Sequence, residues 1–331
     1  MAVVGRPSRS AVYARLDLQI AELWQRMGGL PSPVEAADIW RGIWYEEAHH
    51  STAIEGNTLV LKQVEVLLAE GRAVGNKELA EYLEVRGYAD AATWVYSQAI
   101  EPQGGWHDGV VSTAELRHVH ELAMTPVWDV APHAQAAPTE RPGSFRQHDI
   151  EPFPGGMQPP GFADVPMLVQ DWLDELRRFR HRELDLPERL ARLHCRFEQI
   201  HPFLDGNGRT GRLILNLVLV RLGYPPAMIY KKQRGDYLRA LRRADGGDHG
   251  ALGELLARAV LDTLYRLVIP AVAGPRRLVP LAALATAEMT ATALRVAAIR
   301  GRLQATKGGD GQWRSTRQWV DEYVTTRYRR R

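Results

Sequence analysis

The sequence has one cysteine, Cys195, among 331 residues, so an intramolecular disulfide cannot form. This excludes the small disulfide-stapled secreted domains and indicates a reducing compartment, so we expect a cytoplasmic protein. No run approaches the ~20 apolar residues that a membrane-crossing helix needs. The N-terminus, MAVVGRPSRSAVYARLDL, lacks the continuous apolar core of a secretory signal. No Walker A pattern occurs, which excludes a P-loop nucleotide site.

Charge is distributed unevenly along the chain. Apolar residues make up 45% and charged residues 24%, as in ordinary globular proteins, and the length suits two or three domains. Residues 276–331 carry a net charge of +8, whereas residues 1–275 carry −5. A basic terminal segment on an acidic body indicates a polyanionic partner, or else a solvated arginine-rich end. The stretch AVAGPRR at 271–277 is the best candidate for a domain boundary.

The apolar pattern predicts helices over most of the chain. Residues 213–222 are apolar nearly all round, which predicts a helix buried on every side. Residues 126–162 are rich in proline and glycine and cannot form one long helix, although SFRQHDIEPF leaves room for a short strand or hairpin. The expected helices are 59–68, 78–98, 112–124, 165–181, 187–200, 213–222, 234–245, 249–270, 280–288, 290–300 and 316–327.

The segment HPFLDGNGRTGR (201–212) has the composition of a phosphate site. Its Gly-Asn-Gly turn at 206–208 lets the backbone approach a phosphate closely, and the amides at the start of the following helix favour an anion. Arg209 and Arg212 are three residues apart, so they share one face of the first helical turn. Both can form forked hydrogen bonds with phosphate oxygens.

Two further residues of this segment suit catalysis of phosphoryl chemistry. Asp205 supplies a hard oxygen ligand suited to a Mg²⁺ ion that bridges phosphates. His201 titrates near neutrality and can take a proton from an attacking hydroxyl. The bland alternative is a glycine-rich helix cap with solvated arginines.

The six residues GNGRTG (206–211) also match the dinucleotide pattern GxGxxG. A Rossmann site needs a strand before the pattern and an acidic residue about 20 positions later. Here a helix is expected before it, and the first acidic residue downstream is Asp236, 30 residues after Gly206. The spacing therefore disfavours a Rossmann site.

Residues 201–212 match the full signature HPFx(D/E)GNGRxxR, and on these residues the chain resembles Fic-domain proteins. The resemblance implies an all-α fold that carries a short β-hairpin. It also implies an enzyme, a protein adenylyltransferase, that moves AMP from ATP to a hydroxyl side chain (Ser, Thr or Tyr) of a target protein with Mg²⁺ and releases pyrophosphate. The implied roles are general base for His201, Mg²⁺ ligand for Asp205, anion hole for Gly206, Asn207 and Gly208, binding of the β- and γ-phosphates for Arg209 and Arg212, and nucleotide-site positions for Thr210 and Gly211.

Two neighbouring segments fit the same resemblance. GSFRQHDIEPF (143–153) occupies the place of the family's hairpin flap, where Ile150 would clamp the target beside its modified residue. YKKQRGDYLRALRRADGGD (230–248) resembles the family's adenosine-side helix, in which Tyr237 would contact the nucleotide. Asp245 stands where an asparagine is often found. A core aromatic is the alternative role for Tyr237.

The segment STAIEGN (51–57) matches the family's inhibitory pattern (S/T)xxxE(G/N). Ser51 and Glu55 are four residues apart and share one face of a helix expected to end near Gly56. By resemblance, Glu55 pairs with Arg212 and blocks the γ-phosphate. One arginine fork cannot bind a carboxylate and a phosphate together. Alternatively, Glu55 orients water for AMP removal, or the segment is an ordinary helix end.

The last domain resembles the winged helix-turn-helix of excisionase-like DNA-binding modules. Two helices are followed by GRLQATKGGDGQWRS, which predicts a hairpin, and by a final helix. Arg295, Arg300 and Arg302 would then meet DNA phosphates or bases. A protein-docking or homodimer-forming role is the alternative.

We therefore expect three parts: an N-terminal helical region (1–104) with the inhibitory motif, a Fic catalytic domain (105–272) and a winged-helix accessory domain (276–331). Two rival functions stay open. The first is an AMP-removing or bifunctional enzyme, and the second is a DNA-binding regulator whose Fic domain senses nucleotides. The histidine pairs 49–50 and 118–120 lack metal-site spacing, and Cys195 lacks a separate histidine partner, so we expect structural roles for them.

Overall fold

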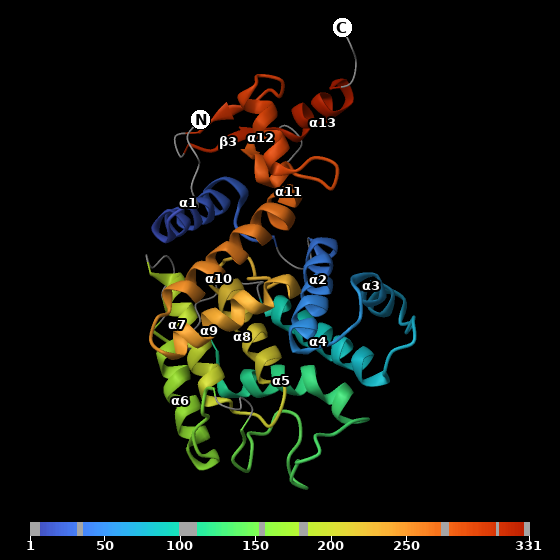
Figure 1. Ribbon diagram of the computed structural model, residues 1–331, viewed down its shortest axis with the longest axis vertical. Coiled ribbons are helices and arrows are strands. Elements are labelled where there is room, and N and C mark those ends of the chain that lie inside the picture. Colours follow the sequence, from blue (N-terminus) through green and yellow to red (C-terminus); the bar gives the residue numbers. More distant parts are fainter. Residues whose placement is uncertain are drawn as a thin grey trace.

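The computed structural model describes residues 7–31, 36–98, 111–151, 156–178, 185–272, 278–308 and 311–327. The fold is mainly helical, as expected, and its described strands all lie after residue 278 (Figure 1). The body holds α1 Arg9–Met27, α2 Ala37–Glu55, α3 Leu61–Glu70, α4 Leu79–Ser97, α5 Thr113–Trp128, α6 Val165–Leu176, α7 Leu186–Ile200, α8 Asn207–Arg221, α9 Arg234–Asp245, α10 Gly250–Thr263 and α11 Ile269–Val272. The terminal unit holds β1 Val279–Pro280, α12 Ala291–Ile299, β2 Thr306–Lys307, β3 Trp313–Ser315 and α13 Arg317–Thr326.

Helix α8 lies at the centre of the body, as its apolar sequence predicts. All its residues except Gly208 are buried, and α2, α4, α5 and α7 pack around it (Figure 1). Burial of a helix on every side contributes about 1.5–3 kcal/mol for each large apolar side chain. The N-terminal end of α8 is therefore fixed rigidly, and that end carries the signature arginines.

Local signals in the sequence set where the neighbouring helices begin and end. Ser112 and Glu115 form a capping box at the start of α5, with bonds of 3.2 and 2.8 Å. Helix α2 ends at Gly56, whose φ of 116° suits glycine. The expected end of the helix that carries Ser51 and Glu55 is therefore confirmed.

The segment expected to form a hairpin flap is an irregular loop in its described residues. No strand occurs in 143–151 or 156–161, and residues 152–155 lie outside the described part. Arg146 holds the loop instead: its backbone N–H donates to the carbonyl of Pro202 at 2.9 Å and its Nε to the carbonyl of His201 at 3.0 Å. Bonds between this arginine and the signature loop replace the cross-strand pairs of a hairpin.

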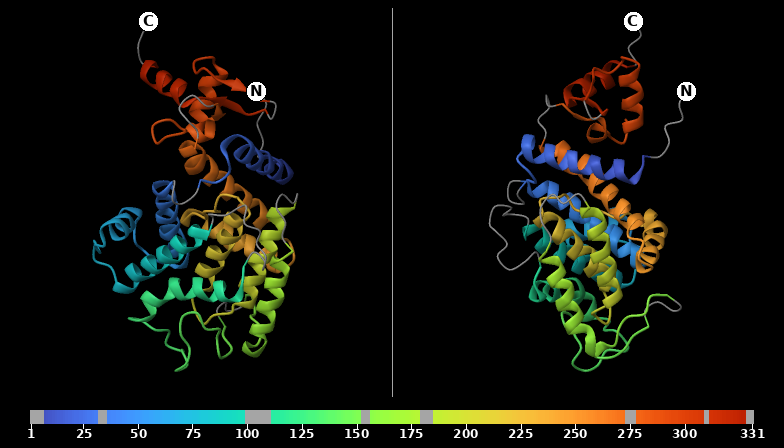
Figure 2. Two further views of the ribbon diagram at one scale, coloured as in Figure 1. Left: turned by 180° about the vertical axis from the view of Figure 1, so that it is seen from behind. Right: turned by 90° about the vertical axis from the view of Figure 1, so that its left-hand side faces the viewer.

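The terminal unit has a three-stranded antiparallel sheet in the order β1-β3-β2, with α12 and α13 beside it (Figure 2). The expected helix 280–288 is only a 3₁₀ turn, Leu281–Leu284, because Thr286 and Met289 close a turn through reciprocal backbone bonds of 2.9 and 3.3 Å. Arg314 of β3 forms an ion pair of 2.5 Å with Glu22 of α1, which connects this unit to the body. Of the predicted boundary 271–277, residues 273–277 lie outside the described part.

None of the described helices combines the length and the apolar character that a membrane span requires.

Candidate active site

A cavity of about 900 Å³ opens at the N-terminal end of α8. Its wall is built from the last turn of α2, from α4, from the loop of the expected flap, from the end of α7 and from one face of α9. Many of the residues that the sequence singled out line this cavity: Glu55, Ile150, His201, Asp205, Gly206, Asn207, Gly208, Arg209, Arg212, Tyr237 and Asp245. The structure thus brings most of the candidate residues together in one cavity.

His201 ends α7 in a strained backbone conformation. Its φ is 48° and its N–H donates to the carbonyl of Phe197 at 3.0 Å; no other described non-glycine residue has a positive φ. This geometry costs free energy and is typical of functional sites. The imidazole Nδ1 lies 3.2 Å from the carbonyl oxygen of Glu198. A carbonyl only accepts, so Nδ1 carries the proton and Nε2 keeps the lone pair of a base.

Burial keeps this histidine neutral. The residue is 8% exposed, and burial lowers the pKa of His201 to about 4, helped by the nearby charge of Arg146. At neutral pH the ring is therefore unprotonated and able to accept a proton.

The turn after His201 is fixed by a glycine and by a side chain of its own. Gly206 has a φ of 75°, and a Cβ on it would run into Met124, so only glycine fits there. The amide of Asn207 bonds both the N–H of Phe203, at 2.9 Å, and its carbonyl, at 2.7 Å. The Asn207 side chain therefore stabilises the loop.

Arg212 is buried and already paired. Its Nη2 donates to Oε1 of Glu55 at 2.7 Å, and its Nε donates to Oγ of Ser51 at 2.7 Å. A third bond of 3.0 Å reaches the carbonyl of Ser51. The contact expected between the inhibitory motif and this arginine is thus present. Attraction by Glu55 outweighs burial and raises the pKa of Arg212 far above its ordinary value, so the guanidinium stays charged.

Two expected nucleotide-site residues lie away from the cavity. Thr210 and Gly211 are fully buried and do not line it. A Cβ on Gly211 would meet the ring of Phe197 and the carboxylate of Glu198, so the glycine permits the close packing of α8 on α7. These two residues support the site through packing.

Tyr237 is both a core residue and a wall of the cavity. It is 1% exposed, and its hydroxyl lies 2.7 Å from Nε2 of His194. Burial lowers the pKa of His194 to about 3, helped by the nearby charge of Arg212, so this histidine stays neutral. Tyr237 is therefore a core aromatic, and it also lines the cavity where it would contact a nucleotide.

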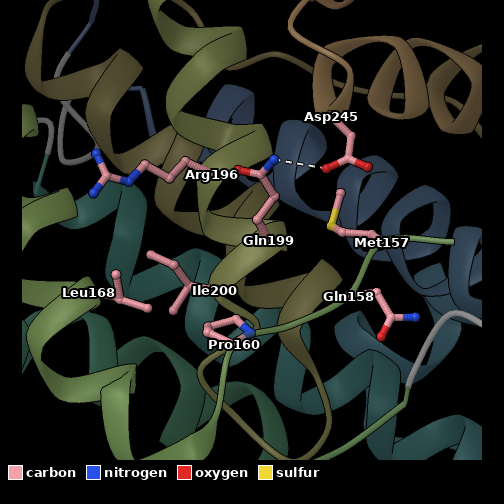
Figure 3. Close-up of a pocket in the computed structure, with 8 residues that line it drawn as sticks. All are labelled: Met157, Gln158, Pro160, Leu168, Arg196, Gln199, Ile200 and Asp245. Atoms are coloured by element: carbon pink, nitrogen blue, oxygen red, sulfur yellow. Dashed lines mark hydrogen bonds between the residues drawn. The ribbon is translucent and has the colours of Figure 1, made fainter.

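A smaller pocket of about 290 Å³ adjoins the main cavity (Figure 3). It lies between the loop 156–160 and the last turn of α7. Gln199 donates to Asp245 at 2.8 Å, and Met157 lies beside this pair (Figure 3). Met157 and Asp245 line both spaces and separate them.

Sequence reasoning missed His120, which organises the signature loop from α5. Its Nδ1 accepts from the N–H of Gly143 at 2.7 Å, its Nε2 lies 3.0 Å from the carbonyl of Asp205, and its ring stacks on Phe203 with centroids 3.7 Å apart. It was expected to be an ordinary structural histidine, and no spacing in the sequence links it to residues 201–212.

We expect His120→Phe to destabilise the protein while preserving the stacking on Phe203. The buried N–H of Gly143 would lose its acceptor, which costs about 1–3 kcal/mol of unfolding free energy. Burial lowers the pKa of His120 to about 4. Between pH 6.5 and 4 the unfolded state therefore binds more protons at this site, and stability falls as pH falls, by up to ~1.4 kcal/mol per pH unit. The variant should lose this contribution.

Urea unfolding of both proteins at pH 7.5, 6 and 5 measures the two effects. His118→Phe, two residues earlier on a more exposed face of α5, is the matched control and should change neither. An equal pH slope in wild type and His120→Phe would contradict the assignment.

Cys195, His49 and His50 have structural surroundings. Cys195 is buried, and burial raises the pKa of its thiol to about 12, which removes a thiolate nucleophile at neutral pH. His49 and His50 lie 4.7 Å apart, ring to ring, and His50 packs edge-on against Tyr230. In the part of the chain that the structure describes, no cluster of three or more His, Cys, Asp or Glu side chains suits a metal ion.

Comparison with known proteins shows which proteins the chain is similar to. Residues 110–219 match the model of the Fic/DOC family. "Protein adenylyltransferase Fic" of Drosophila willistoni is 32% identical over 221 residues, which are 67% of this chain and 41% of that protein; its Drosophila mojavensis counterpart is 31% identical over 40% of its length. The chain thus spans about two fifths of the length of these curated relatives.

Solved structures show the same fold. Fic-1 (residues 134–508) from C. elegans aligns with a TM-score of 0.60 and 25% identity, over 77% of this chain and 71% of that one. A Fic family protein from Desulfovibrio desulfuricans G20 aligns over 96% of this chain and 98% of that one, with a TM-score of 0.57 and 23% identity. The chain therefore contains a domain of the Fic/DOC family, and the signature turn 201–212 forms the floor of its cavity.

Proposed function

We propose that this protein transfers AMP from ATP to a hydroxyl side chain of a target protein and that Glu55 restrains the transfer. One observation carries the proposal. A neutral imidazole lies on the wall of a 900 Å³ cavity whose floor is a glycine turn with two buried arginines. This is the set of groups that attack by a hydroxyl on a nucleotide phosphorus requires.

The residues divide the reaction as follows. Nε2 of His201 takes the proton of the target hydroxyl while its oxygen bonds to the α-phosphorus. The bond between the α-phosphorus and the bridging oxygen to the β-phosphate breaks, and pyrophosphate leaves with both electrons. Arg209 and Arg212 neutralise the charge that develops on this leaving group.

The surroundings of Asp205 suit a magnesium ion. Its side chain is 47% exposed at the cavity, and its Oδ1 accepts from the N–H of Gly206 at 2.6 Å, which fixes the carboxylate. Mg²⁺ typically binds one or two carboxylates together with substrate phosphates and water. Asp205 would hold the ion, which when bound would neutralise phosphate charge.

ATP labelled at one phosphorus at a time tests the reaction class. In full-length Glu55→Gly, self-modification with label from the α-phosphate and none from the γ-phosphate supports AMP transfer. Incorporation of the γ-label would show phosphate transfer and reject the proposal.

Removal of AMP is the rival reaction at the same site. Glu55 has a side-chain exposure of 39% and lines the cavity, where a carboxylate can orient water towards a bound AMP ester. Mass spectrometry of AMP-modified protein incubated with wild type distinguishes the two. Loss of the AMP with wild type, and retention with Glu55→Gly, would favour removal.

A second function, DNA binding, is favoured by the terminal unit. Arg295, Arg300 and Arg302 are exposed on and just after α12, and no described carboxylate pairs with them. The three-stranded antiparallel sheet, whose strands precede and follow this helix in the chain, supports a winged helix-turn-helix as the proposed arrangement. We also propose that the chain divides into the parts 1–104, 105–272 and 276–331.

A DNA-binding regulator whose Fic domain only senses nucleotides would retain its regulatory function when His201 is replaced.

We expect the full chain to bind duplex DNA with an affinity that falls steeply with salt, because each neutralised phosphate contributes about 0.9 to the logarithmic salt slope. Replacing Arg295, Arg300 and Arg302 by alanine should flatten that slope. Fluorescence anisotropy at 50–200 mM salt, roughly the range over which such binding weakens, measures this. Unchanged binding in the triple variant, or none in wild type, would leave docking or a homodimer as the role of this unit.

A further inference from the structure

The second signature arginine, Arg209, is buried between two carboxylates, and two of its donor atoms have no acceptor among the described residues. The residue is 4% exposed, and its Nη2 lies 3.4 Å from Asp205. Its Nη1 lies 3.4 Å from Oε1 of Glu84, a residue of α4 that also lines the cavity. Nε and Nη1 have no hydrogen-bond acceptor among the described residues. Buried guanidinium donors without an acceptor are costly, and the oxygens of a phosphate bound beside Arg209 would supply acceptors.

Glu84 is held in place by the residue that follows the inhibitory helix. Nδ2 of Asn57 donates to Oε2 of Glu84 at 3.0 Å and to the carbonyl of Glu81 at 2.8 Å. Oδ1 of Asn57 accepts from the N–H of Leu59 at 3.0 Å, and the residue is 5% exposed. These bonds leave the Asn57 amide one orientation, so the Glu84 carboxylate also has a fixed place.

We propose that Asn57 and Glu84 are positioning residues that hold Arg209 for the phosphates. The carboxylates of Glu84 and Asp205 attract Nη1 and Nη2 of the guanidinium, and so fix its plane at the wall of the cavity. The proposal rests on the proposed function and adds two positioning residues to its site. The segment 51–57 would then obstruct one arginine through Glu55 and support the other through Asn57.

The geometry argues against Glu84 as a second obstruction. Glu55 binds its arginine with a hydrogen bond of 2.7 Å, which is the length of a strong charge-assisted pair. Glu84 approaches Arg209 at 3.4 Å without a hydrogen bond, and one of its oxygens is already used by Asn57. Such a contact orients the guanidinium and leaves its donors available.

Calorimetry on full-length Glu55→Gly tests this, with Mg·ATP and AMP as ligands. Adding Glu84→Gln or Asn57→Ala should weaken ATP binding roughly tenfold, the lower end of the effect of losing an outer-shell partner at metal sites. AMP binding should not change, because AMP lacks the β- and γ-phosphates. Glu84→Gln preserves the shape of the side chain and an acceptor for Asn57, so it separates charge from folding.

Glu81→Gln is the matched control. Glu81 lies one turn before Glu84 and accepts from the N–H of Thr58 at 2.6 Å and from its hydroxyl at 2.7 Å, so it holds the same segment without contacting Arg209. It should leave both affinities unchanged. Tighter ATP binding in Glu84→Gln would show an obstruction and overturn the proposal, as would equal weakening of ATP and AMP. If Glu55→Gly alone binds no ATP, the proposed function fails, and the inference fails with it.

Discussion

Replacing Glu55 by glycine is expected to increase self-modification with ATP by at least tenfold. In the structure, Nη2 of Arg212 donates to Glu55 at 2.7 Å, so a γ-phosphate must displace a charged partner to reach this arginine. Close charge pairs couple by about 1.5 kcal/mol or more, which corresponds to at least a tenfold change in binding. Incorporation of α-labelled ATP, together with calorimetry of Mg·ATP binding, measures the effect.

Charge and helix shape can be separated at this position. Glu55→Gln keeps the length of the side chain and removes the charge, and should recover much of the activity. Ser51→Ala removes one bond to Arg212, which has a length of 2.7 Å, but leaves Glu55 in place, so it should activate less. If Glu55→Gly and Glu55→Gln are no more active than wild type, Glu55 is not an inhibitory residue.

Replacing His201 should remove transfer while ATP binding persists. A general base contributes about 10²–10⁴-fold to rate, and the ring takes no part in the expected phosphate contacts. We expect a loss of roughly 10²–10⁴-fold in kcat in the Glu55→Gly background, with the Kd for Mg·ATP nearly unchanged. Single-turnover transfer and calorimetry on the same protein give both values.

The backbone at His201 dictates which variant tests this best. Its φ of 48° strains alanine, whereas asparagine adopts this region more readily, so His201→Asn tests the loss of the base with the least change in fold. Measuring both variants separates chemistry from folding. Transfer by His201→Asn at the rate of its parent would exclude His201 as the base.

The site could be predicted where the chemistry depends on residues close together in sequence. Segment 201–212 contains the base, the carboxylate, the glycine turn and both arginines, and the helical spacing places the arginines on one face. Helical spacing also places Ser51 and Glu55 on one face of their helix. The helices around them followed from apolar periodicity, which reports burial directly.

The errors fell where the chain has little periodic pattern. The segment 143–153 was expected to form a hairpin flap, but its described residues, 143–151, contain no strand, and Arg146 bonds the backbone of His201 and Pro202. The helix 280–288 was shortened by a turn closed between Thr286 and Met289. Short segments of this kind are decided by a few side-chain and backbone bonds, which alternation or helical spacing does not reveal.

The sequence by itself determined the chemical groups of this protein: an imidazole, a carboxylate, two guanidiniums and a glutamate at the end of a helix, together with the buried helix that carries the arginines. Only the tertiary structure decided their partners and states. It placed Glu55 on Arg212 across 157 residues, joined Asn57 to Arg209 through Glu84, and buried His201 deeply enough to keep it neutral. The physical reason is that protonation and ion pairing depend on burial and on distance in space, and helices remote in sequence set both.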